Sequence, residues 1–243
     1  MTTMTERPPG VPGAGPPHLA PRIGRLLGTV PDDVDGVVGH LEQLQEMLVE
    51  DHGRRDGVAA FNRLHLRITE DIRAQLDDDH VPDKDFLARL DVELARRYLQ
   101  ALRASVAGGV PPRSWAVLVD RRSQRRISPV QLAVVGANAL VNLDLPAAVV
   151  RTCTVLGRGA PGAAERADCR AVHDVVTQHL AALIRDGASC CIAIVLPREI
   201  AWRQALELWD RRSRPTAYER EIDALDLRTA LLGRGLLTPG ALT

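Results

Sequence analysis

The residues best suited to chemistry are three carboxamides within a long apolar stretch. Gln131, Asn138 and Asn142 are spaced by seven and four residues. At about 100° per residue, this spacing places all three on one face of a helix. Their neighbours are almost all apolar, so we expect the amides to be buried and to need hydrogen-bond partners. They are suited to holding the carbonyl or hydroxyl oxygens of a ligand, or to tying neighbouring helices together, as buried amides often do.

Pro146 lies inside the same predicted helix, four residues after Asn142. Proline has no amide hydrogen to donate to the carbonyl four residues back, so the sequence predicts a kink with a free carbonyl beside the amides. Asp144 lies about 200° round the helix from Asn142. On that opposite face it would cap a neighbour, pair with an arginine, or support the site from behind.

Asp91, Tyr98 and His65 are titratable residues that helical spacing places on apolar faces. A buried carboxyl group with no basic partner has a raised pKa, which suits general acid or base catalysis. The alternatives are a buried ion pair for Asp91 and a satisfied core histidine for His65. Trp202, seven residues before Trp209, either fills the core or forms a wall of a ligand site.

Local motifs indicate no metal site and no cofactor. The seven histidines form no H-x-x-x-H or H-E-x-x-H pair, and G-x-S-x-G, P-loop and G-x-G-x-x-G sequences are absent. The 31 basic and 31 acidic residues cancel, which argues against a nucleic acid or an acidic membrane surface as partner. The cysteines lack C-x-x-C spacing and are predicted to be reduced: Cys153, Cys169, Cys190 and Cys191.

The chain divides into an arm and one domain. Residues 1–30 are rich in proline and glycine, which predicts a disordered arm without the character of a signal peptide, and hence a cytoplasmic protein. Residues 31–243 predict a single all-α domain, a bundle of about seven or eight helices around the kinked apolar helix. Helices are expected near 32–48, 57–76, 84–106, Trp115, 128–156, 163–185, 197–212 and 215–232, the central one broken by 157–162 and the last stopped by Gly233.

Two segments leave alternatives open. The run from Ser128 to Val150 has nearly the length of a membrane span, but its amides, Asp144 and Pro146 fit a buried core helix better. The short apolar run 188–196 fits either a strand or a buried helix.

Three segments also match a known pattern. Phe61 to Thr69 is similar to F-N-R-L-Y-L-x-V-T, Leu90-Asp91-Val92 with Tyr98 resembles an L-D-V segment ending in Tyr, and Gly136 to Leu145 resembles G-x-N-A-H-x-N-x-D-L. The chain resembles a family of actinobacterial proteins that shares a domain of unknown function. The resemblance lies in these segments and in Ala201-Trp202, Trp209 and 233–237. The single lysine, Lys84, and the Arg-, Ala- and Val-rich usage also indicate a GC-rich, actinobacterial genome.

The chain departs from that pattern at two positions. Leu140 stands where the pattern has His, so the His/Asp pair with Asp144 is absent here. His65 stands where the pattern has Tyr, and the two exchanges fit either a pocket adapted to its ligand or drift in a structural role. Asn62 and Arg63, from the first matching segment, are assigned as a substrate-binding residue and a supporting residue.

The leading functional hypothesis is a cofactor-free enzyme of actinobacterial secondary metabolism, a cyclase or dehydratase acting on a largely apolar molecule. Its amides and Trp202 would hold the substrate, while Asp91, Tyr98 or His65 would move the proton. The alternatives are a non-catalytic ligand-binding or scaffold protein and a metal-dependent hydrolase with ligands from separate helices. A small molecule is the expected partner, and the oligomeric state stays open, a homodimer included.

Overall fold

A helix surrounded by other helices runs through the middle of the molecule. It consists of α6 (Pro129–Ala139), a π-turn η1 (Leu140–Asp144) and α7 (Leu145–Val155). The computed structural model describes residues 20–78, 81, 83–185 and 198–237, and these form an all-α bundle around that helix. By length and composition the segment Pro129–Val155 could cross a membrane, but its most apolar stretch is buried inside the bundle.

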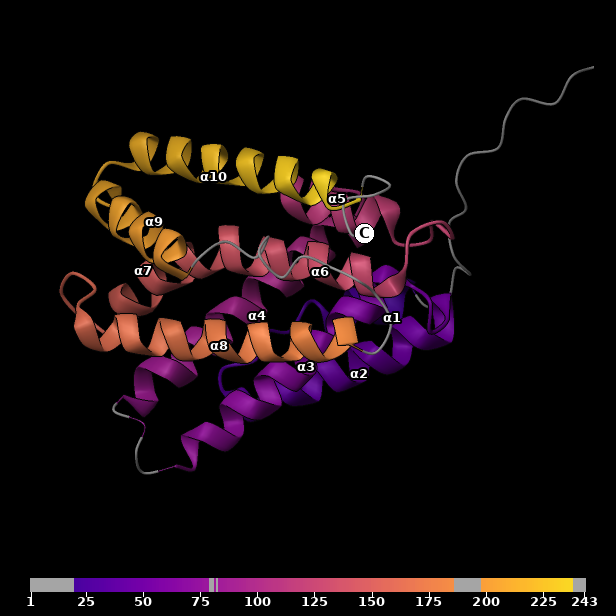
Figure 1. Ribbon diagram of the computed structural model, residues 1–243, viewed down its shortest axis with the longest axis horizontal. Coiled ribbons are helices and arrows are strands. Elements are labelled where there is room, and N and C mark those ends of the chain that lie inside the picture. The colour runs from indigo at the N-terminus through magenta and orange to yellow at the C-terminus, as the bar shows by residue number, and fades with distance from the viewer. Residues whose placement is uncertain (1–19, 79–80, 82, 186–197, 238–243) are drawn as a thin grey trace, which may run out of the picture.

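The remaining helices cover the central helix from several sides. The described elements are α1 (Ala20–Leu26), α2 (Val34–His52), α3 (Gly57–Leu76), α4 (Lys84–Val106), α5 (Arg113–Arg121), α8 (Ala163–Arg185), α9 (Arg198–Arg211) and α10 (Pro215–Gly235). In Figure 1, α10 runs along one side of the central helix and α8 along the other. Helices α3 and α4 pack against it from behind, and α9 packs on α7.

Side-chain caps fix where several helices begin. Asp33, Asp56 and Asp83 each accept a hydrogen bond from the amide three residues later, at the starts of α2, α3 and α4. Ser128 and Gln131 form a reciprocal capping box at the start of α6. Helix α5 is capped from another element, because Asp226 of α10 accepts from the backbone amides of its first two residues, at 2.7 and 2.9 Å.

Most predicted helices are present, with differences at both ends of the chain. Helix α1 falls within the predicted arm, and its Ile23, with Leu27 just beyond it, packs in the core, so the prediction of disorder is wrong for these residues. Gly233 does not end the last helix, which continues to Gly235. The run 188–196 lies outside the described residues.

The irregularity expected at Pro146 takes the form of the π-turn. The Leu145 amide donates to the Leu140 carbonyl, five residues back instead of four. In a regular α-helix the proline ring would collide with the Asn142 carbonyl. The π-turn contains one extra residue, which changes the backbone hydrogen-bond register just before Pro146. The helix then continues to Val155.

Gly136 gives a direct test of how closely α6 and α3 pack. A Cβ added at Gly136 would lie 2.3 Å from Cδ2 of Phe61, which is fully buried and cannot move aside. We expect Gly136→Ala to lower the free energy of unfolding by roughly 1–3 kcal/mol through overpacking. Urea denaturation measures this change.

Gly39→Ala is the matched control, since Gly39 lies within α2 with open space around its Cβ position. It should raise stability by roughly 0.5–1 kcal/mol through helix propensity alone. Equal effects of the two substitutions would contradict the close α3–α6 contact.

Candidate functional site

The structure buries most of the predicted site residues. Asp91 and Tyr98 are fully buried, and His65, Asn138 and Asn142 are 1% exposed. In the described part of the chain these side chains form separate polar clusters.

The first cluster lies between α3 and α4 and contains the predicted acid/base residues. Thr69 donates to Asp91 Oδ1 at 3.4 Å, and the Tyr98 hydroxyl donates to Asn62 Oδ1 at 3.3 Å. The His65 ring lies 5.4 Å from the Tyr98 ring between centroids. Asn62 also donates to the Leu41 carbonyl at 2.9 Å, which ties the cluster to α2.

Burial controls the protonation of this cluster. It raises the pKa of Asp91 to about 7, with a small opposing effect from the Thr69 hydrogen bond, and lowers the pKa of His65 to about 4. The arginine partner considered for Asp91 is absent from its hydrogen bonds among the described residues. Asp91 Oδ2 and His65 Nδ1 are buried without a hydrogen-bond partner there.

The second cluster is a ladder of amides that leads from the central helix to α10. Asn142 Nδ2 donates to Asn138 Oδ1 at 2.8 Å, and Asn138 Nδ2 donates to the backbone carbonyl of Thr229 at 3.0 Å. Gly233 of α10 packs beside this ladder, because a Cβ at its position would lie 3.4 Å from Asn138 Nδ2, in van der Waals contact. Asn142 Oδ1 has no partner among the described residues.

The third polar contact joins η1 to α5. Trp115 Nε1 donates to Asp144 Oδ2 at 2.9 Å. Burial raises the pKa of Asp144 to about 7, while Arg97 and the indole hydrogen bond lower it and Asp226 raises it. The Trp115 ring also lies 5.2 Å from those of Phe61 and Tyr98, so it connects this contact to the first cluster.

Three predicted residues lie apart from these clusters. The Gln131 side chain is engaged in the capping box, accepting from the Ser128 amide at 3.0 Å. Arg63 lines a small cleft of about 80 Å³ between α3, α6 and α8. Trp202 borders a cavity of about 10 Å³ beside Cys169, on the α8–α9 side.

Sequence reasoning missed Trp115 and Thr229 as partners. An indole on an apolar face requires an acceptor, so Trp115 carried a usable signal. Thr229 accepts through its backbone carbonyl, and because every residue has one, the sequence gives no signal for this contact.

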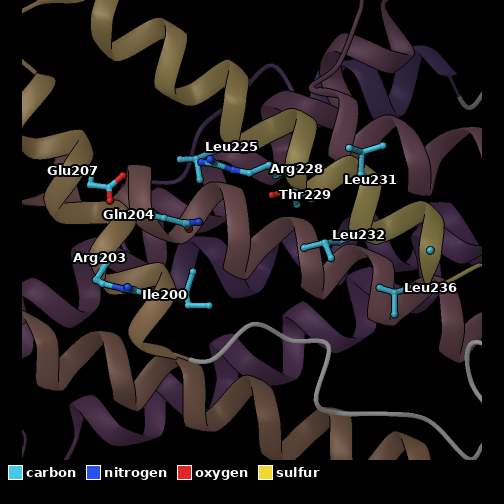
Figure 2. Close-up of a pocket in the computed structure, with 11 residues that line it drawn as sticks. Ile200, Arg203, Gln204, Glu207, Leu225, Arg228, Thr229, Leu231, Leu232 and Leu236 are labelled. Atoms are coloured by element: carbon cyan, nitrogen blue, oxygen red, sulfur yellow. The ribbon is translucent and has the colours of Figure 1, made fainter.

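The largest cavity described is a groove between α9 and α10, with a volume of about 890 Å³. Figure 2 shows side chains from both helices along it. Thr229 belongs to the wall, so the amide ladder ends at the groove. The lining residues are mostly apolar on α10, with a more polar row on α9: Ile200, Arg203, Gln204, Glu207, Leu225, Arg228, Thr229, Leu231, Leu232, Gly235 and Leu236.

The described part of the chain shows neither an activated cysteine nor a metal-binding cluster. Cys153 and Cys169 are buried free thiols whose pKa burial raises. The described residues contain no group of three or more His, Cys, Asp or Glu side chains that could hold a metal ion.

Fold and interior together define an all-α bundle with a buried polar centre. The chain belongs to a family of unknown function (DUF5995), whose model matches residues 34–196. The match contains all three polar clusters except Thr229, and ends before α9 and α10, which form the groove. No curated protein and no solved structure matches the chain.

The pH dependence of stability tests the buried state of Asp144. Its folded-state pKa of about 7 lies above the ordinary value of 3.8. Between about pH 4 and pH 7 the folded protein therefore holds a proton that the unfolded chain has released, and stability falls as pH rises through this window. Asp144→Asn keeps an acceptor for Trp115 but cannot titrate, so its unfolding free energy should fall less steeply there.

Urea unfolding at several pH values measures the difference between Asp144→Asn and the wild type. Asp35→Asn is the control, because the Asp35 side chain is 82% exposed, and it should follow the wild-type profile. A profile of Asp144→Asn parallel to the wild type would show that the carboxyl is ionised throughout.

Proposed function

We propose that this protein binds a largely apolar small molecule in the groove between α9 and α10. The observation that carries the proposal is the groove itself, because about 890 Å³ lined mainly by aliphatic side chains matches the sites that hold small ligands. Leu231 and Leu232 of its wall are 55% and 36% exposed, so apolar surface is available for a ligand to cover.

The polar groups of the groove indicate an anionic or hydrogen-bonding end on the ligand. Arg203 has no hydrogen-bond or ion-pair partner among the described residues. Arg228 is exposed and makes one bond, to Glu221 at 3.2 Å. An aliphatic carboxylate is the simplest molecule with this chemistry.

Substitution on α10 tests the groove. We expect Leu231→Glu to weaken binding of dodecanoate at least tenfold, because it places a charge where the alkyl chain would lie. Displacement of a bound fluorescent dye, anilinonaphthalene sulfonate, measures the affinity. Leu227→Glu is the matched control: Leu227 is 45% exposed on the same helix but does not line the groove.

The same displacement assay tests whether Arg203 binds the carboxylate end of the ligand. Arg203→Gln should weaken dodecanoate but leave dodecanol unchanged, because only the carboxylate gains from the guanidinium. Equal loss of binding in Leu231→Glu and Leu227→Glu, or no binding by the wild type, would contradict the proposal.

An acid/base enzyme is the second candidate, and the protonatable interior favours it. Asp91 and Asp144 have pKa values near neutrality, and Asp91, His65 and Asn142 each retain an unpartnered polar atom in the described structure. In this proposal Asn138 and Asn142 hold a substrate oxygen while Asp91, Tyr98 or His65 moves the proton in a cyclisation or dehydration. Asp91, Tyr98 and His65 do not line the groove, so the substrate would have to enter between helices.

Comparison of co-purified ligands distinguishes the two candidates. Native mass spectrometry of wild-type protein and Asp91→Asn should find different compounds if the enzyme exists, since the variant would retain substrate that the wild type converts. The same compound in both proteins would favour binding without turnover. Melting temperatures show whether the variant is folded. A role in actinobacterial secondary metabolism and a cytoplasmic location remain part of the proposal.

A further inference from the structure

A further cavity, of about 500 Å³, lies on the surface between two connecting segments. One segment joins α2 to α3 and the other joins α5 to α6. The lining residues contribute charged and hydrogen-bonding side chains, and few apolar ones: His52, Arg55, Asp56, Ser123, Gln124, Arg125 and Ile127.

Paired groups connect the two segments that border this cavity. Arg122 binds Asp56 through two hydrogen bonds of 2.6 and 2.9 Å, and its carbonyl accepts from the Gly57 amide at 2.9 Å. Asp56 also caps α3 through the Ala59 amide. The two segments are therefore fastened together, and the negative charge of Asp56 is neutralised inside the structure.

The positive charge at the rim is not neutralised. Arg55 and Arg125 are exposed and have no ion-pair or hydrogen-bond partner in the described part of the chain. Their sequence neighbours Arg54 and Arg126 are likewise exposed and unpaired among the described residues. Four exposed arginines of the two segments thus have no counter-charge among the described residues, although the chain as a whole has no net charge. Two of the four, Arg55 and Arg125, line the hollow.

The neutral lining residues add hydrogen-bond donors. Ser123 contributes a hydroxyl group, and Gln124 has its amide nitrogen available, because its Oε1 accepts from Arg121 at 3.4 Å. Guanidinium groups bind phosphate oxygens through paired hydrogen bonds, and donors from two segments suit the several oxygens of a phosphate group.

We propose that this cavity, here called the arginine pocket, binds a small phosphorylated molecule through Arg55 and Arg125. Its volume lies within the range of small-ligand sites. A hollow of this volume, between two segments that are bonded to each other, differs from a flat basic surface that would follow a nucleic acid backbone. The site is independent of the apolar groove, with which it shares no lining residue.

Titration calorimetry with inorganic pyrophosphate at low ionic strength tests the arginine pocket. The double variant Arg55→Gln/Arg125→Gln should bind at least tenfold more weakly than the wild type. The control Arg103→Gln/Arg220→Gln removes the same charge from exposed positions that line neither cavity, and should bind within twofold of the wild type. Unchanged melting temperatures establish that both variants are folded.

Three results would overturn the proposal. They are the absence of pyrophosphate binding by the wild type, an equal loss in the two double variants, and binding of a single-stranded oligonucleotide in place of pyrophosphate. The last result would indicate a nucleic acid surface. Leu231→Glu should leave pyrophosphate binding unchanged. The experiments therefore distinguish a wrong proposal for the groove from a wrong proposal for the arginine pocket.

Discussion

The central constraint on this structure is the burial of one helix, α6–η1–α7, inside the bundle. Asn138, Asn142 and Asp144 on this helix are almost fully shielded from water, so they need hydrogen-bond partners inside the protein. Asn138 reaches the Thr229 carbonyl, and Asp144 receives the Trp115 indole. These contacts fix α10 and α5 against the centre, and the Asp226 carboxylate then fastens α10 to the start of α5.

Because the central helix is buried, the polar groups of the core and the cavities that could bind a ligand lie in different places. The predicted acid/base residues lie in the core, where the rings of His65 and Tyr98 are in contact. Burial there raises the pKa of Asp91 to about 7 and lowers the pKa of His65 to about 4. The two proposed binding sites, the apolar groove and the arginine pocket, lie at the surface. The amide ladder is the structural link between centre and groove, because Thr229 belongs to both.

Several features of the site were predictable from residue type and spacing. Helical periodicity placed Asp91, Tyr98 and His65 inward, and each is buried. The apolar neighbours of Asn138 and Asn142 predicted their burial in the same way. Gln131 has the right spacing but lies in the first turn, where capping of the helix start uses its side chain. The disturbance at Pro146 was expected as a kink, and the helix accommodates it with a π-turn.

The sequence by itself determined the all-α class, most helix positions and which faces turn inward, because these depend on local periodicity and capping. Only the tertiary structure decided which buried groups meet. Trp115 and Asp144 are 29 residues apart, and Asn138 and Thr229 are 91 apart. Both cavities arise in the same way, between α9 and α10 and between two connecting segments, since a hollow depends on how helices pack and no local pattern encodes that packing.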